Sequence, residues 1–251
     1  MKRTFLFLLP AAFLFSCNSN ASRSGGQTDS RMDTTLVATD KVPVTAPQSP
    51  AVWQSLFNGK DLSGWRGYQH KPTDAWEVVD GVLHCNGHKK DAAHTDLITD
   101  QQYQNFVLQL QWKISPASNS GIMFHVTEDQ PYTSSSGPEF QIIDDEGWPG
   151  KLEAWQHTGC NYAMQLPDSI HVNPVGQWNS TKIVVQGPHV EHWLNGEKIL
   201  SYELWSPEWK RQKAAGKWKD VPSYGMAKTG HIALQYHGGD VWFKDIQLKA
   251  F

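Results

Sequence analysis

The chain has 251 residues and a formal net charge of −3 at pH 7. This mildly acidic balance, without a basic run, argues against a nucleic-acid partner. Aromatic residues make up 12% of the chain and include 12 tryptophans, a composition that favours β-strands and leaves some rings free to stack on sugars.

The N-terminus has the pattern of an exported lipoprotein. It begins with the basic Met1-Lys-Arg, and residues 4–15 form an apolar run that is too short to span a bilayer stably. Cys17 then completes an arrangement that resembles a loose lipobox, in which the cysteine is lipidated and becomes the mature N-terminus. We therefore predict a signal peptide over residues 1–17 and a membrane anchor at Cys17. The protein would then be held in the cell envelope, facing the periplasm or the cell surface. An ordinary signal peptide with an incidental cysteine is the alternative.

The next segment, residues 18–51, is rich in Ser, Thr, Asn, Gly and Pro. It carries too few large apolar side chains to form a core, so we predict a disordered linker. The remaining residues, 52–251, are of a suitable size for one β-sandwich domain.

Strand patterns dominate this domain. In residues 105–114, apolar side chains alternate with polar ones, as expected of a long half-buried strand. Asn195-Gly196 has the residues of a two-residue hairpin turn, and residues 207–216 resemble one short helix that begins with Pro and ends with Gly. Further strands are predicted at residues 121–126, 178–186, 190–194, 197–202, 230–237 and 241–249. This rhythm predicts an all-β sandwich with one short helix and long loops.

The strand within residues 136–145 carries an unusual pair of polar side chains. Glu139 and Gln141 lie on one face, and Phe140 and Ile142 lie on the other, because strand side chains alternate. This face is either the floor of a binding site or an ordinary solvated surface.

Two other strands have polar residues at even spacing. Met123 and His125 are predicted to share a face, as are Gln235 and His237. If these strands join the Glu139 strand in one sheet, His125, Gln235 and His237 would meet Glu139 and Gln141 on its surface. A buried carboxylate beside imidazoles is suited to acid–base catalysis. The alternative for each histidine, taken singly, is a structural residue with no part in catalysis.

Other chemistries find less support in the sequence. A retaining glycosidase needs two carboxylates about 5 Å apart, but Glu139 and Asp144 have odd spacing and fall on opposite faces of a regular strand. No histidine spacing demands a metal, and we predict no metal ligands. Cys85 and Cys160 either pair or remain two separate buried thiols.

Six segments resemble conserved motifs of the bacterial 3-keto-disaccharide hydrolase family, also described as 3-keto-glucoside 1,2-lyase/3-keto-2-hydroxyglucal hydratase domains. The segments are residues 56–65 (LFNGKDLSGW), 119–125 (NSGIMFH), 137–144 (GPEFQIID), 176–179 (GQWN), 191–196 (EHWLNG) and 230–238 (GHIALQYHG). The resemblance covers about residues 52–251, in order. It implies a concanavalin A-like jelly-roll β-sandwich of two antiparallel sheets.

The resemblance also implies an activity. The substrate class would be 3-keto-glycosides, whose C3 ketone acidifies the C2 proton, so that a base can remove it and the C1 substituent leaves by β-elimination. Water can then rehydrate the enone. On matching positions, Glu139 and His237 would be the base and the acid, in either order. Sugar-binding or supporting roles fall to His125, Gln141, Asp144, Trp148 and Gln235. No motif demands a cofactor, although a divalent metal would be compatible with the chemistry.

Two alternatives remain at this stage. A non-catalytic carbohydrate-binding lipoprotein would use the same concave face and would bind unoxidised glycans without turnover. A conventional glycosidase would release the aglycone from an unmodified glucoside.

Overall fold

The computed structural model describes residues 52–251. The predicted signal peptide, the lipidation site Cys17 and the linker at residues 18–51 lie outside the described residues. Within residues 52–251, no helix is both long enough and apolar enough to cross a membrane.

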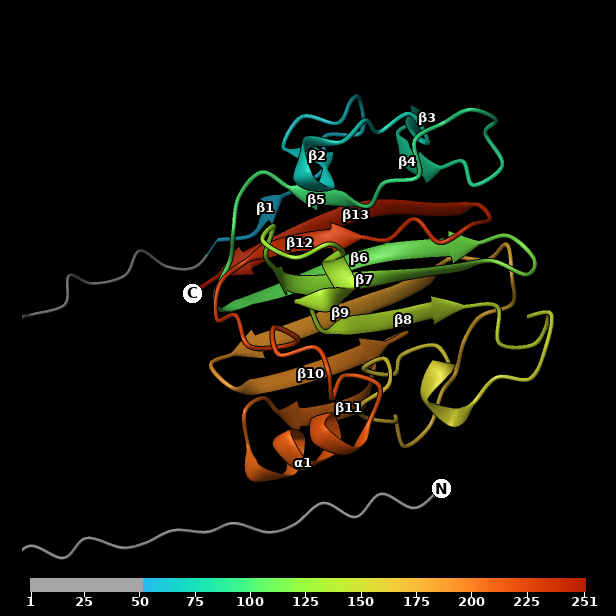
Figure 1. The fold of residues 1–251 in the computed structure, drawn as a ribbon. Helices are drawn as coiled ribbons and strands as arrows, with labels where there is room; N and C mark the ends of the chain where they lie inside the picture. Colours follow the sequence, from blue (N-terminus) through green and yellow to red (C-terminus); the bar gives the residue numbers. More distant parts are fainter. Residues whose placement is uncertain (1–51) are drawn as a thin grey trace, which may run out of the picture. The chain divides into compact units, whose positions relative to one another are not determined.

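The domain is built from two antiparallel sheets (Figure 1). The larger sheet has eight strands in the order β11-β10-β9-β6-β13-β4-β3, and β1 also pairs with β13. Its strands are β1 (Gln54–Ser55), β3 (Trp76–Val79), β4 (Val82–Cys85), β6 (Phe106–Ile114), β9 (Asn179–Gln186), β10 (His189–Leu194), β11 (Glu197–Glu203) and β13 (Val241–Ala250).

The smaller sheet has five strands in the order β2-β5-β12-β7-β8. These strands are β2 (Trp65–Gly67), β5 (Leu97–Thr99), β7 (Asn119–Val126), β8 (Glu139–Ile143) and β12 (His231–Leu234). The three strands that the sequence singled out for their polar residues are therefore neighbours. Figure 1 shows β12, β7 and β8 as one layer in front of strands of the larger sheet.

The hydrophobic core fills the space between the two sheets. Strand β6 alternates buried and half-buried residues along its whole length, as its sequence predicts. From the smaller sheet, Ile122 and Phe140 join this core, so the residues next to them on each strand point away from the larger sheet. We call that side the outer face of the smaller sheet.

Local structure follows the expected turn and cap chemistry. Asn195 and Gly196 both have positive φ angles, 49° and 88°, and join β10 to β11 in a two-residue hairpin. The one α-helix among the described residues is α1 (Pro207–Ala215), and the Ser206 hydroxyl accepts a hydrogen bond from the Trp209 backbone N–H at its start. Short 3₁₀ turns occur at Tyr68–His70, Thr133–Ser135 and Ala154–Gln156.

A β-bulge in β7 overturns one prediction. His231 pairs with Val126 and Ala233 pairs with Met123, so Phe124 and His125 together oppose one residue of β12. His125 has a φ angle of 53°, and its ring packs against the core side chains Phe106 and Phe124, with ring centroids 6.1 and 5.2 Å away. The prediction that His125 shares a face with Met123 is therefore wrong, because the extra residue reverses the alternation.

The two described cysteines are separate. Cys85 and Cys160 are free, buried thiols. Burial raises the pKa of both thiols, that of Cys160 to about 12.

Candidate active site

A cavity of about 430 Å³ opens on the outer face of the smaller sheet. Strands β7 and β8 and the residues directly after β12 (His231–Leu234) provide its floor, and the segments around η1 (Tyr68–His70), η2 (Thr133–Ser135) and Lys217 contribute its walls. Its polar and ionisable lining residues are Tyr68, Lys71, His94, Thr95, Asp96, Asn119, Tyr132, Thr133, Ser134, Glu139, Gln141, Tyr162, Lys217, Gln235, Tyr236 and His237. The structure thus brings together Glu139, Gln141, Gln235 and His237, four of the residues that the sequence proposed.

Glu139 is the most perturbed acid of this cavity. Only 4% of the residue is exposed. Burial, reinforced by the negative charge of Asp96 and partly offset by Lys217, raises the pKa of the Glu139 carboxyl group to about 8. A carboxyl group with such a pKa is protonated at neutral pH and loses its proton at slightly higher pH. A pKa near the working pH suits a group that both donates and accepts protons.

Gly121 makes room for the Glu139 side chain. A Cβ atom at Gly121 would lie 2.0 Å from Glu139 Oε1 and 2.8 Å from its Cδ. Any larger side chain at this position would have to displace the Glu139 carboxyl group, which lies directly over the backbone of β7.

Three buried amide oxygens in this cavity lack a hydrogen-bond partner among the described residues. They belong to Asn119, Gln141 and Gln235. The Gln141 amide is fixed in its orientation, because its Nε2 donates to the carbonyl of Gln156 at 3.1 Å, which leaves Oε1 as the free acceptor. Buried unpaired acceptors are costly, and the hydroxyl groups of a sugar would satisfy them.

Basic side chains surround the mouth of the cavity. Lys71, His94, Lys217 and His237 are exposed and line it, whereas its two acidic residues lie deeper. The Lys217 ammonium lies 3.3 Å from the hydroxyl of Tyr162 and over its ring, 4.4 Å from the centroid. The His94 ring stacks on Tyr236, with 4.4 Å between centroids. The mouth therefore favours groups that carry or develop negative charge.

Sequence reasoning missed Asp96 and Asn119. Asp96 directly precedes β5, a strand of three residues that is too short to give a clear alternation. Asn119 begins β7, in a segment that the sequence treated only as the entry to that strand. The available signal was the even spacing of Asn119 with Gly121 and Met123.

Three predicted site residues lie elsewhere. His125 is packed into the core, and its Nε2 is 2.8 Å from the carbonyl of Gln104. Asp144 accepts hydrogen bonds from the backbone N–H groups of Ala117 and Gly147, both at 2.8 Å, and lines a different cavity of about 680 Å³. Trp148 lines neither of these two cavities. The structure therefore gives these three residues no place beside Glu139.

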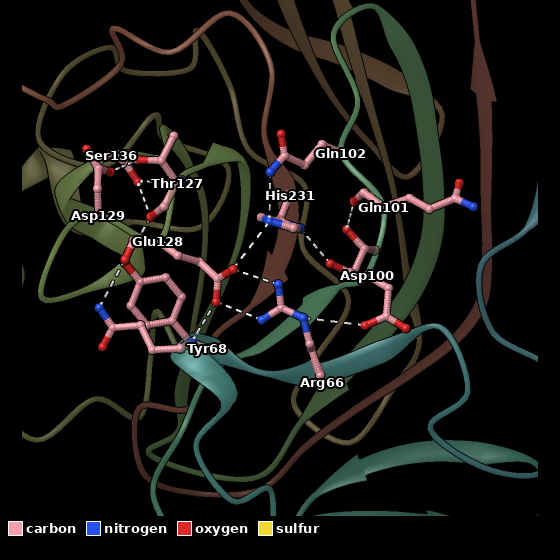
Figure 2. A network of polar contacts seen from close by, with 12 residues as sticks. Arg66, Tyr68, Asp100, Gln101, Gln102, Thr127, Glu128, Asp129, Ser136 and His231 are labelled. Atoms are coloured by element: carbon pink, nitrogen blue, oxygen red, sulfur yellow. Dashed lines mark hydrogen bonds and ion pairs between the residues drawn. The ribbon is translucent and has the colours of Figure 1, made fainter.

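A polar network lies at one end of the smaller sheet (Figure 2). Arg66 binds both oxygens of Glu128, at 2.7 and 2.6 Å, and lies 3.5 Å from Asp100. Arg66 is also the main reason that the pKa of Glu128 falls to about 2. His231 of β12 lies 3.7 Å from Glu128 and is a structural residue of this network.

This network supports the wall of the cavity. The Tyr68 hydroxyl lies 2.9 and 2.7 Å from the backbone carbonyls of Thr127 and Gln130 and shares its one hydrogen between them. Residues 127–136 include Tyr132, Thr133 and Ser134 of the cavity lining. The Arg66–Glu128 pair therefore fixes the segment that carries one side of the site.

The described residues offer no ready-made metal centre. No group of three or more His, Cys, Asp or Glu side chains in residues 52–251 is arranged to hold a metal ion. What this cavity combines is a buried acid, a histidine and free acceptors, a set that fits proton transfer on a hydroxyl-rich ligand.

Comparison with known proteins agrees with this interpretation. Residues 52–249 match a family described as 3-keto-alpha-glucoside-1,2-lyase-like domain. A 3-keto-disaccharide hydrolase of Bacteroides thetaiotaomicron is 29% identical to the chain, and the match covers 99% of each protein.

Solved structures agree in fold. A candidate glycosyl hydrolase from Parabacteroides distasonis has 40% identity and a TM-score of 0.75, covering 79% of this chain and 94% of that one. A second from the same organism has 27% identity and a TM-score of 0.61, covering 80% and 100%. A Bacillus subtilis protein with a galectin-like fold has 13% identity and a TM-score of 0.51, covering 79% and 94%, which speaks to the fold alone. The predicted class, a jelly-roll sandwich of two antiparallel sheets, is confirmed.

Proposed function

The chain belongs to the family of 3-keto-alpha-glucoside-1,2-lyase-like domains, and from this premise we propose that it cleaves 3-keto-glycosides by C2 proton abstraction and β-elimination. Its relatives support a carbohydrate-active enzyme that acts on glycosides. The observation that carries the proposal for this chain is Glu139, a buried acid in a cavity that also holds His237 and three free amide acceptors.

The elimination needs one base and one acid. A C3 ketone acidifies the proton on C2, because the resulting carbanion is delocalised onto the ketone oxygen. We assign the base to His237, which lines the mouth of the cavity, and the acid to Glu139, which is protonated at neutral pH because its pKa is about 8.

Elimination comes first and hydration second. His237 takes the C2 proton, the electron pair of that C–H bond forms the C1=C2 double bond, and the bond between C1 and the glycosidic oxygen breaks. The departing oxygen takes the proton of Glu139. In the hydration that follows, the Glu139 carboxylate accepts a proton from the water that adds to C1, and His237 returns a proton to C2. The net reaction is hydrolysis of the glycosidic bond.

Sugar binding is assigned to the amide oxygens. Gln141 and Gln235 were expected to bind sugar hydroxyl groups, and Asn119 joins them because its oxygen is also buried and free. Hydroxyl donors would satisfy all three acceptors, whereas a ketone, which only accepts, would not. The ketone of the substrate is therefore assigned to the side of Lys217, which would stabilise negative charge on its oxygen.

The test is turnover of a synthetic 3-keto-glucoside. Wild-type protein should release the aglycone, and deuterium at C2 should slow the release. Glu139→Gln and His237→Asn should each reduce kcat/KM by about 10²–10⁴-fold, the usual contribution of a general acid or base. Glu146→Gln, which removes an exposed carboxylate outside this cavity, should have no effect.

The pH profile tests the order of the two roles. An acid must be protonated, so kcat/KM should fall as the pH rises through about 8, the pKa of Glu139. A rate that instead rises through this pH would make Glu139 the base. Saturable binding of unoxidised glycans without turnover of 3-keto-glucosides would support a binding protein, and release from an unmodified glucoside would support a conventional glycosidase.

A further inference from the structure

The cavity holds a second carboxyl group, Asp96, that the reaction described above does not use. Asp96 lines the same cavity as Glu139. Ile98, two residues further along, packs with Met123 and Ala233 in a cluster on the outer face of the smaller sheet. Alternation therefore puts Asp96 on the same face as Glu139, with β12 and β7 lying between the strands of the two residues.

Asp96 is held in place by hydrogen-bond donors. The backbone N–H of Tyr236 donates to its Oδ1 at 2.8 Å. The hydroxyl of Thr133, which is buried, donates to its Oδ2. Burial raises the pKa of the Asp96 carboxyl group, but both donors favour its carboxylate form and oppose this rise, as do the charges of His237 and Lys71.

Glu139 has the opposite surroundings. Nothing in residues 52–251 donates a hydrogen bond to its carboxyl group, and the side chain lies against the backbone at Gly121. The charged and titratable groups around it are Asp96 before β5, Lys217 after α1, Tyr162 and Tyr224 beside it, and Tyr68, Lys71, His94, Tyr132, Tyr236 and His237 nearer the mouth.

Two carboxyl groups that line one cavity do not both ionise readily, because each charge opposes the other. The donors around Asp96 favour its carboxylate form, whereas Glu139 has no donor among the described residues. We propose that Asp96 is the fixed negative charge that keeps Glu139 protonated and so ready to act as the acid. Asp96 is then a positioning residue that acts through Glu139. The catalytic consequence of this inference depends on the proposed function, but the effect of the Asp96 charge on Glu139 does not.

The test of this charge effect needs no substrate. Infrared difference spectra between wild type and Glu139→Gln should contain the C=O band of a protonated carboxylic acid at pH 7. The same difference in an Asp96→Asn background should titrate away at lower pH. A band that titrates at the same pH in both backgrounds would overturn the proposal, even if no keto-sugar is turned over.

The kinetic test uses the same variant. If the loss of the Asp96 charge lowers the Glu139 midpoint by about one pH unit, Asp96→Asn should lose about fivefold in kcat/KM at pH 8 and almost nothing at pH 6. An equal loss at every pH would indicate a merely structural role and would overturn the proposal.

Two further variants provide a matched control and a second test of the effect of Asp96 on Glu139. Asp100→Asn removes a carboxylate just beyond the other end of β5, where it faces Arg66, and it should leave the midpoint unchanged. Thr133→Val keeps Asp96 but removes one donor, so it should shift the midpoint in the same direction by a smaller amount. This variant keeps the proposal testable if Asp96→Asn does not fold, and an unchanged midpoint in it would then count against the proposal.

Discussion

Gly121 shows how much of this site depends on a single missing side chain. The nearest Glu139 atoms would all lie within 3 Å of an added Cβ, the Cγ atom at 2.9 Å. We predict that Gly121→Ala displaces the carboxyl group and lowers kcat for a 3-keto-glucoside at least tenfold, because small misplacements of a catalytic group are costly. Steady-state kinetics and the infrared band of Glu139 would measure this effect.

A matched control separates displacement from general destabilisation. Gly187 has a φ angle of 58° and open space around its Cα atom. Gly187→Ala should lower the free energy of unfolding by about 1 kcal/mol through backbone strain and leave kcat unchanged. If Gly121→Ala behaves like this control, Glu139 is not held as described.

At the level of elements, the segment from Thr127 to Ser136 provides one wall of the site. It is held by the Arg66–Glu128 pair and by Tyr68, and within it only η2 is regular. We predict that Glu128→Gln lowers the free energy of unfolding at pH 7 by about 1–3 kcal/mol, because a partly buried charged pair loses one partner. It should also raise KM more than it lowers kcat, since the wall moves while Glu139 does not.

The stabilisation that Glu128 provides should depend on pH. The folded-state pKa of Glu128 is about 2, below the ordinary value of 4.5 for a glutamate side chain. Its contribution to stability is therefore present above pH 4.5 and lost as the pH falls towards 2. Denaturant unfolding should show the wild-type advantage shrinking over this range. Glu208→Gln, which removes an exposed ion pair with Arg211, should cost less than about 1 kcal/mol at any pH.

At the level of the whole molecule, attachment to the membrane remains a prediction, because Cys17 lies outside the described residues. We propose that the protein is exported and anchored through a lipid on Cys17. Cys17→Ala should move the protein from the membrane fraction to the soluble fraction and abolish incorporation of a labelled fatty acid. A variant that stays with the membrane, or a wild type without label, would contradict this proposal.

The sequence predicted the long strands well, and short elements poorly. Strand β6 was evident because five apolar residues alternate in it, whereas β2 and β5 have three residues each and no usable period. For this reason the sequence did not predict Asp96 as a site residue. The placement of His125 failed for a different reason, since a bulge arises from pairing with β12 and leaves no local mark in the sequence. Glu139 was found because it and Gln141 form a polar pair on one face of a strand whose other face is apolar.

The unlinked thiols have a practical consequence. Cys85 and Cys160 lie in the protein without a covalent bond between them, so the native fold of residues 52–251 owes nothing to an oxidant. The domain should reach the same structure in a reducing cytoplasm as in an oxidising envelope, with or without disulfide-forming catalysts. It can therefore be prepared in either compartment, and reductants can be added to any assay of this protein without unfolding it.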